Sequence, residues 1–319
     1  MSTIFVRVHA GNTVGPIWTE SGIVTGGGDA SVQVTVAESG SNGDGAAAPA
    51  GAASTRLLPA IKKAHLVGVA GVAADHGLQR IVSVGVNGDM KIWNGETRSC
   101  THVIDTTPAD AWCVAHSPVL AQAVTGGAAG RVTLWDVDAG QRVTTLPPPS
   151  LAFVTALSFA PDGRRLAVCG ADGGVHVLDV DAGGAALASI PTAHLLPVRA
   201  AAWAHDGSLL YTASDDKRVA VWDMSGGGGG GEAVPLVCIL TGHTHWVTGA
   251  AAAADRFVLA TCSADRTAKL WDTRKRAVVH SFGGHTGGLG GVAWSPDGMR
   301  MATVADNGVL GIASVAAVL

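Results

Sequence analysis

The chain has 319 residues, of which 47% are hydrophobic and 14% are charged, and its formal net charge is −4. A chain of this length can bury a large core, and the composition fits a strand-rich globular protein. The small negative charge gives no electrostatic case for nucleic-acid binding. No stretch reaches roughly 18 consecutive apolar residues, and no basic segment leads into a long apolar one at the N-terminus. We therefore expect neither a membrane span nor a secretory signal.

Cysteine usage favours a reducing compartment. The five cysteines have no paired spacing, and three fall in strand patterns, where a small buried thiol is the ordinary expectation. We therefore predict free thiols in a soluble intracellular protein. The cysteines are Cys100, Cys113, Cys169, Cys238 and Cys262.

A four-part pattern of His, a hydroxyl residue, Asp or Asn, and Trp recurs along the chain at one internal spacing. Repeats of roughly 40–45 residues that end in Trp-Asp are the signature of a β-propeller blade. The three full copies are His65, Ser83, Asn87 and Trp93, then His194, Thr212, Asp216 and Trp222, then His243, Thr261, Asp265 and Trp271.

The same spacing divides the chain into seven units, and the third and fourth of them lack the His. The regular interval between units is 42 to 44 residues. The pattern predicts an all-β, seven-bladed propeller that occupies residues 1–319 as one domain. The position that Trp takes in the full copies falls at Thr35, Trp93, Trp135, Leu178, Trp222, Trp271 and Ala313.

The four-part pattern has a structural explanation. Each blade is a small sheet that cannot bury its two faces alone, so neighbouring blades supply the core. Asp265 can accept hydrogen bonds from His243 and from a turn N–H, His243 can reach Thr261, and Thr261 can accept from the indole of Trp271. Such a chain pairs all the buried polar groups. Because it recurs once per blade, we interpret it as structural rather than as a catalytic or metal site.

Two low-complexity segments interrupt the repeat, and the termini complete it. Residues 37–55 are expected to form a disordered insertion, and residues 225–231 a glycine-rich loop. Residues 4–8 have a strand pattern, whereas the last unit ends with its third strand near residues 309–312. We predict that the N-terminal strand completes the last blade and closes the ring, which hides two strand edges.

Patterns that could indicate an enzyme fail on inspection. The glycine-rich stretch at residues 283–288 coincides with the start of a repeat and lacks the Lys-Ser or Lys-Thr of a phosphate-binding loop. His245 lies beside His243, but no third ligand has a regular spacing. We therefore predict no enzyme activity, no catalytic residue, no cofactor and no metal.

Two tryptophans are candidate partner-binding residues. Counted from the His position, Trp246 lies at +3 and Trp112 at +5, on loops that open on one face of the ring. Aromatic anchors dominate many interfaces, although both residues could instead pack at the channel rim. Arg199 shares the +5 position, and Asp215 lies on the same face. Three other tryptophans fall at +9, a packing position between blades: Trp18, Trp203 and Trp294.

Several segments resemble the WD-repeat subunit of the superkiller (Ski) complex. The more specific ones are Asp110-Ala111-Trp112 and residues 193–199 with 212–216; residues 242–247 are similar too. The resemblance implies a non-catalytic adaptor that holds a tetratricopeptide scaffold and a helicase feeding messenger RNA to the exosome. For the nucleus, the resemblance implies that the protein is a subunit of the RNA polymerase II-associated factor complex. It implies protein partners in cytoplasm and nucleus. We expect neither direct nucleic-acid binding nor homo-oligomerisation.

A different class of function stays open. Trp271-Asp272-Thr273-Arg274 matches the Trp-Asp-x-Arg box of propellers that act as substrate receptors of cullin-4 ubiquitin ligases. In that case Arg274 would make charge-assisted contacts to the ligase adaptor. A third alternative is a propeller subunit of another large assembly, such as a ciliary complex.

Overall fold

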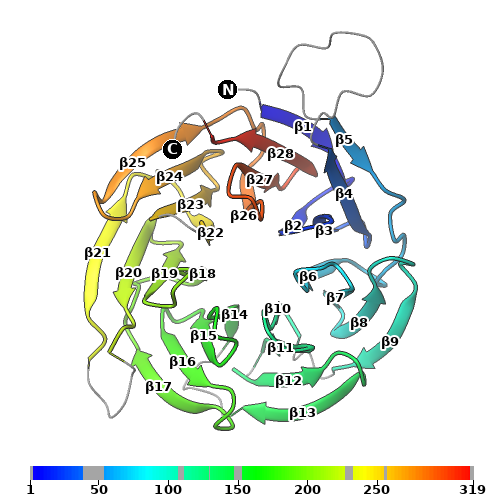
Figure 1. The fold of residues 1–319 in the computed structure, drawn as a ribbon, viewed down its shortest axis with the longest axis horizontal. Helices are drawn as coiled ribbons and strands as arrows, with labels where there is room; N and C mark the ends of the chain where they lie inside the picture. Colours follow the sequence, from blue (N-terminus) through cyan, green and yellow to red (C-terminus); the bar gives the residue numbers. More distant parts are fainter. Residues whose placement is uncertain are drawn as a thin grey trace.

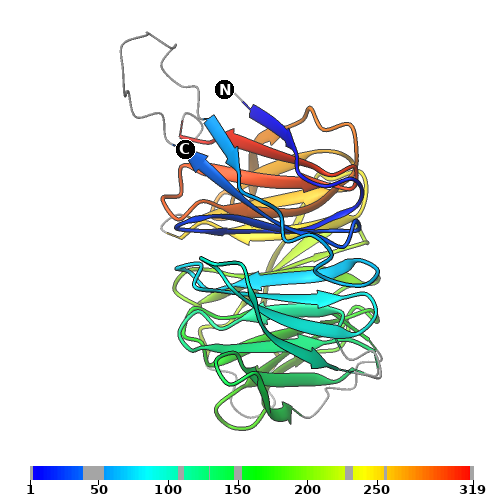
Figure 2. The ribbon, with the colours of Figure 1, turned by 90° about the vertical axis from the view of Figure 1, so that its right-hand side faces the viewer.

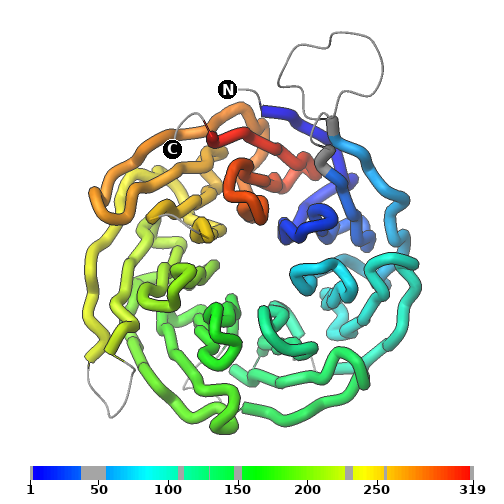
Figure 3. The backbone as a smooth tube through the Cα atoms, viewed as in Figure 1, coloured from blue at the N-terminus to red at the C-terminus, as the bar shows by residue number. Residues whose placement is uncertain are grey.

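The computed structural model describes residues 3–38, 54–106, 111–128, 130–146, 153–226, 233–254 and 257–316. These residues form seven four-stranded antiparallel sheets. The sheets stand around a central axis as a seven-bladed propeller (Figure 1), and the predicted fold class is confirmed. Figure 3 shows the blades following one another around the ring in sequence order. The described residues contain no helix long and apolar enough to cross a bilayer.

The innermost strand of each blade lies nearest the axis. Small residues dominate these strands, so seven of them can approach one another around the axis. Neighbouring inner strands pack directly together all around the ring. In blade order they are β2 (Thr13–Thr19), β6 (Val69–Ala74), β10 (Cys113–His116), β14 (Val154–Phe159), β18 (Val198–Trp203), β22 (Val247–Ala252) and β26 (Leu289–Trp294).

The second strand of each blade is the most completely buried. In β15, for example, five of six residues are buried, because both faces of the strand meet neighbouring blades. These strands are β3 (Gly22–Gly27), β7 (Arg80–Gly85), β11 (Gln122–Gly126), β15 (Arg165–Gly170), β19 (Leu209–Ser214), β23 (Val258–Ser263) and β27 (Arg300–Ala305).

The third strand carries the Trp-Asp position of the repeat. Apolar residues occupy both faces of this strand, because the strand lies between two neighbouring blades. These strands are β4 (Val32–Glu38), β8 (Asp89–Asn94), β12 (Val132–Asp136), β16 (Val175–Asp179), β20 (Arg218–Asp223), β24 (Ala268–Asp272) and β28 (Val309–Ser314).

The outer strands cover the circumference and are largely exposed. In the last blade this place is taken by β1 from the other end of the chain, which pairs antiparallel with β28 from Thr3↔Ala313 to Arg7↔Val309. The predicted closure is therefore confirmed, and Figure 2 shows β1 alongside the last blade. The outer strands are β5 (Ser54–Leu57), β9 (Cys100–Asp105), β13 (Gln141–Leu146), β17 (Ala185–Ile190), β21 (Leu236–Thr241), β25 (Ala277–Phe282) and β1 (Thr3–Arg7).

Tryptophans at the +9 position join neighbouring blades. The indole N–H of Trp203 donates to the carbonyl of Ser158 at 3.1 Å, and that of Trp294 to the carbonyl of Ala251 at 2.9 Å. Both side chains are buried, whereas Trp18 is half-buried beneath the guanidinium of Arg300. Each bond crosses from one blade to the previous one, so this position fixes the spacing of blades as well as filling the core.

The bounds predicted for the first insertion need correction. β4 reaches Glu38 and β5 begins at Ser54, with Ala37 paired to Thr55, because the third and outer strands of blade 1 extend into the low-complexity sequence. The predicted insertion 37–55 is therefore too long at both ends, and its remainder, residues 39–53, lies outside the described residues. Most of the predicted glycine-rich loop, residues 227–231, also lies outside them.

Candidate protein-interaction face

The ring has two faces with different chain segments. We call connection face the side that carries the loops from each outer strand to the next inner strand, together with the turns between second and third strands. The opposite side, which we call the hairpin face, carries the other two turns of each blade. The four-part pattern lies at the connection face, because its His is in the connecting loop and its Asp is in the turn beside that loop.

Blade 6 holds the complete network. His243 Nδ1 lies 2.8 Å from Asp265 Oδ2, and His243 Nε2 lies 2.9 Å from Thr261 Oγ1. The indole N–H of Trp271 donates to the same Thr261 hydroxyl at 2.8 Å. The carboxylate of Asp265 also accepts from the backbone N–H of Thr244 at 3.0 Å. The network therefore ties the connecting loop, the turn and two strands together.

Blade 5 repeats this arrangement with its own residues. His194 Nδ1 lies 2.9 Å from Asp216 Oδ2 and its Nε2 lies 2.8 Å from Thr212 Oγ1. Trp222 Nε1 donates to the same hydroxyl at 3.0 Å. All four predicted residues of this blade come together.

In blade 2, one member of the network differs from the residue predicted from the sequence. His65 Nε2 lies 2.7 Å from Ser83 Oγ, and Trp93 Nε1 donates to Ser83 at 2.8 Å. The partner of His65 Nδ1 is the carboxylate of Asp89 at 2.6 Å, whereas Asn87 is exposed at the turn. A carboxylate accepts a more favourable bond from imidazole than an amide does. The signal in the sequence was an acid two residues after the turn position.

Blades 1 and 7 have partial networks. In blade 1, His9 contacts Asp29 at 3.1 Å and Thr25 at 3.0 Å, but Thr35 replaces the Trp and its hydroxyl is buried without a partner. In blade 7, His285 Nε2 lies 2.8 Å from the Thr303 hydroxyl, while the buried His285 Nδ1 has no partner. These two blades meet where the ring closes.

Burial and hydrogen bonding shift the pKa values of the His and Asp side chains in these networks. Burial tends to raise the pKa of Asp265, but hydrogen bonds from Thr267, His243 and the Thr244 N–H outweigh it and lower the pKa to about 2. Burial lowers the pKa of His243, and the neighbouring Asp265 only partly offsets this. For His285, which has no carboxylate beside it, burial lowers the pKa to about 4.

We predict that the corrected assignment in blade 2 will appear in stability measurements. Asp265→Ala and Asp89→Ala each leave a buried His without its acceptor, so each should lower the free energy of unfolding by roughly 1–3 kcal/mol. Asn87→Ala, at an exposed turn, should change it by less than about 0.5 kcal/mol. Denaturant titration of the three variants measures this. Equal losses for Asn87→Ala and Asp89→Ala would contradict the assignment of Asp89.

We also predict that acid destabilises the fold in two steps. His285 and other buried histidines have pKa values below 6.5 in the fold, so the unfolded chain binds more protons and stability falls as the pH drops from 6.5 towards 4. Asp265 contributes stability above its unfolded pKa of 3.8, and this is lost as the pH falls towards 2. Melting temperatures across this range measure both steps. His285→Gln should reduce the first step, and an unchanged pH profile would contradict it.

The two candidate tryptophans both lie exposed on the connection face. Trp112 is 46% exposed and Trp246 is 47% exposed. Trp112 makes an edge contact with Phe153 of the next blade, with ring centroids 5.8 Å apart. Trp246 contacts the neighbouring His245 ring at 4.9 Å, within its own loop. Trp246 is thus the freer aromatic surface, whereas Trp112 also bridges two blades.

The remaining candidates split between the two faces. Arg199 and Asp215 bind each other on the connection face, with guanidinium–carboxylate distances of 2.7 and 3.0 Å. Arg274 lies on the hairpin face, where its guanidinium stacks over Phe257 with 3.4 Å to the ring centroid. The structure therefore does not bring Arg274 together with the other candidate partner-binding residues.

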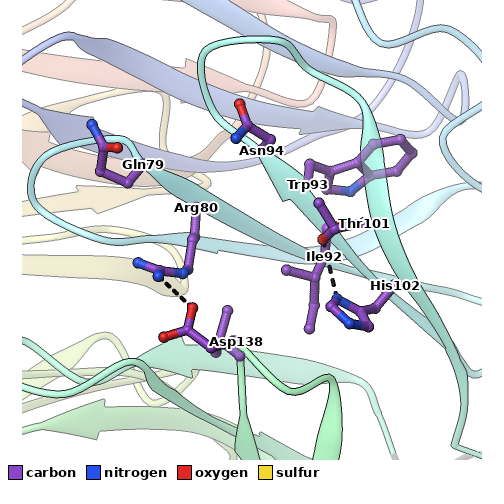
Figure 4. A pocket seen from close by; sticks show the side chains of 9 residues that line it. Gln79, Arg80, Ile92, Trp93, Asn94, Thr101, His102 and Asp138 are labelled. Carbon is purple, nitrogen blue, oxygen red and sulfur yellow. Dashed lines mark hydrogen bonds and ion pairs between the residues drawn. The ribbon is translucent and has the colours of Figure 1, made fainter.

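A hollow on the hairpin face between blades 2 and 3 is lined by Arg80, Trp93, His102 and Asp138 among others. Figure 4 shows that the Arg80 guanidinium points at Asp138, with which it forms an ion pair. Among the described residues, no group of three or more His, Cys, Asp and Glu side chains could hold a metal ion.

The cysteines are free thiols, of which Cys169 and Cys262 are buried and Cys113 is half-buried. Burial raises the pKa of Cys113 and Cys262 to about 12. A nucleophilic cysteine requires the opposite shift. These thiols fill space between strands, as their sequence positions predict.

Comparison with known proteins agrees with the geometry of the blades. Residues 140–179, 186–223, 235–272 and 276–312 match the family described as "WD domain, G-beta repeat". These four stretches of the chain match the WD repeat. Each matched stretch begins at an outer strand and ends in the third strand of the next blade, so the four together include the first three strands of blades 4 to 7. Propellers of this type generally mediate protein–protein interactions and are generally non-catalytic.

Parts of the chain are similar to several curated WD-repeat proteins. One stretch is 30% identical over 130 residues to the WD repeat-containing protein VIP3 of Arabidopsis thaliana, covering 37% of this chain and 40% of that protein. Another is 27% identical over 143 residues to Striatin-4 of Mus musculus, covering 38% and 19%. A third is 37% identical over 62 residues to Pre-mRNA-processing factor 19 homolog 2 of A. thaliana, covering 19% and 12%. The matched parts span less than half the length of each relative.

Proposed function

We propose that this WD-repeat protein is a non-catalytic adaptor of the Ski-complex type, acting in exosome-linked mRNA decay, in transcription elongation, or in both. The observation that carries the proposal is the arrangement of side chains on the connection face. His–Asp pairs such as His194–Asp216 and His243–Asp265 hold its loops against its turns, while Trp112 and Trp246 remain 46% and 47% exposed. Large aromatic side chains on a rigid frame are what a binding surface needs, because little conformational entropy is lost on binding.

Segments of the sequence support a role in RNA-linked complexes. Asp110-Ala111-Trp112 and residues 193–199 resemble the Ski-type subunit, and they include Trp112 and Arg199 of the connection face. One relative is named for pre-mRNA processing. We propose a tetratricopeptide scaffold subunit as the partner on this face, in the cytoplasm or the nucleus.

A second candidate is a substrate receptor of a cullin-4 ubiquitin ligase. It is favoured by Arg274, which is exposed and held over Phe257 on the hairpin face. The guanidinium forms no ion pair with a described residue, so it could meet an acidic group of an adaptor. This function would use the opposite face from the first.

Affinity purification of the full chain followed by mass spectrometry separates the two candidates. The adaptor proposal expects a tetratricopeptide scaffold with its helicase, or subunits of the RNA polymerase II-associated factor complex. Recovery of cullin-4 and its adaptor without these subunits would favour the second candidate and contradict the first.

A further inference from the structure

Blades 5 and 6 present exposed apolar side chains on the connection face. Leu195 is 83% exposed, Leu196 is 46% exposed and Trp246 is 47% exposed. The two connecting loops that carry them belong to adjacent blades, whose inner strands β18 and β22 pack together. Exposed large side chains grouped on neighbouring loops are typical of a surface that is covered by a partner.

Both loops are held rigidly. Asp215 N donates to the carbonyl of Pro197 at 3.0 Å, and the Ser214 hydroxyl to the carbonyl of Leu196 at 3.0 Å. In blade 6, Ala264 N donates to the carbonyl of Trp246 at 3.0 Å. The apolar groups are therefore presented in a fixed arrangement, before any partner binds.

Three cations lie on the turns beside the loops that carry these apolar groups. Lys217, Arg218 and Arg266 are exposed at the turns next to the two loops, and none forms an ion pair with a described residue. The acids of the same turns are already engaged, because Asp215 binds Arg199 and Asp265 binds His243. Asp216 likewise binds His194. The side chains of Asp216 and Asp265 are only 9% and 7% exposed, whereas the three cations are exposed. The accessible charge of these turns is therefore positive, although the whole chain has a net charge of −4.

Two of the cations occupy backbone positions that favour glycine. Lys217 and Arg266 follow the turn residue with φ of 70° and 67°. Non-glycine residues rarely adopt this left-handed conformation, and such exceptions cluster at functional sites. The equivalent positions of the other five blades carry only small residues: Ala30, Gly88, Gly130, Gly173 and Gly308.

From this combination we propose that blades 5 and 6 bind, on the connection face, an acidic segment of a partner protein that carries a large apolar side chain. The apolar side chain packs against Leu195, Leu196 and Trp246, and the carboxylates pair with Lys217, Arg218 and Arg266. This inference rests on the proposed adaptor function and adds to it the chemistry of the segment that is bound.

The turn geometry allows a test with a variant that is expected to stay folded. Replacing both Lys217 and Arg266 with Gly removes two charges and relieves the left-handed backbone, so the melting temperature should stay the same or rise. The probe is a fluorescent synthetic peptide of glutamates with one leucine and one tryptophan, and its binding is followed by anisotropy. We expect the double variant to bind it at least about fivefold more weakly than the unmodified chain.

Matched controls are available in the same chain and in the probe. Arg276, with φ of 56°, lies on the hairpin face of blade 6, so Arg276→Gly makes the same chemical change away from the site and should leave binding intact. A peptide with glutamine in place of glutamate should bind more weakly, and added salt should weaken the glutamate peptide. Leu195→Ser should weaken binding of both peptides. Equal binding of the glutamate and glutamine peptides, or full binding by the double variant, would overturn the proposal.

The proposed function and this inference can fail separately. If the double variant recovers the natural partners as well as the unmodified chain does, while Trp246→Ala loses them, the adaptor function stands and the acidic segment is wrong. If the glutamate peptide binds as expected but purification yields no Ski or elongation subunit, the binding chemistry stands and the assigned complex is wrong.

Discussion

Deleting residues 1–8 is expected to abolish the cooperative unfolding transition or to cause aggregation. The deletion removes β1, which pairs with β28 over five residues and closes the ring through backbone hydrogen bonds. It also removes Val8, which packs against Ile23, Leu310 and Ile312 in the core between blades 7 and 1. An exposed edge of β28 is then free to pair with other molecules. Thermal melting and size-exclusion chromatography measure the result.

Shortening residues 39–53 to a brief linker is the matched control. These residues lie outside the described residues, and they connect β4 to β5, which pair within blade 1. Since the entropic cost of a loop changes slowly with its length, the melting temperature should hardly change. A synthetic peptide of residues 1–9 should partly restore folding of the first deletion. Equal effects of the two deletions, or no effect of either, would contradict the closure of the ring by β1.

Replacing Trp246 with Ala is expected to weaken partner binding by about 2 kcal/mol or more, roughly thirtyfold in affinity, with little change in melting temperature. Trp246 is half-exposed, and among the aromatic rings of the described residues it contacts only its neighbour His245. Trp112→Ala should also weaken binding, with an additional loss of stability because Trp112 contacts Phe153 of the next blade. Calorimetric titration of purified partner against each variant, beside its melting curve, measures both effects. Lowered melting temperature with unchanged affinity for both variants would mean that these residues only pack at the rim.

The fold could be predicted from the sequence because the repeat is locally complete. His, hydroxyl, Asp and Trp at one spacing specify which strand each residue belongs to, and the seven units found at that spacing specify the number of blades. The closing strand followed from counting, since the last unit ends at its third strand while a spare strand precedes the first His. Physical pairing rules were sufficient here, because a buried polar group or a strand edge must find a partner.

The partner of His65 could not be predicted from the repeat. The repeat places Asn87 at the turn, but in blade 6 the residue two positions further, Thr267, already contacts the carboxylate of Asp265 at 2.6 Å. In blade 2 that position holds Asp89, whose carboxylate therefore reaches the His directly. Sequence spacing identifies the turn but does not decide which of two neighbouring side chains points to the imidazole.

The character of the connection face needed three-dimensional information as well. Arg199 and Asp215 were predicted on the same face, but only the structure shows that they bind each other and thus leave other cations unpaired. The exposure of Leu195 likewise depends on how its loop lies against the turn of blade 5. A charge becomes available to a partner only after the internal pairs have been assigned.

The most direct test of the proposed adaptor function is one pull-down that compares Trp246→Ala with Arg274→Ala, because the two residues lie on opposite faces. Both a tetratricopeptide scaffold and a cullin-4 adaptor are offered to each variant and to the unmodified chain. We predict that the unmodified chain captures the scaffold, that Trp246→Ala loses it, and that Arg274→Ala keeps it. Capture of the cullin-4 adaptor by the unmodified chain, with its loss in Arg274→Ala alone, would contradict the adaptor function and favour the ligase receptor.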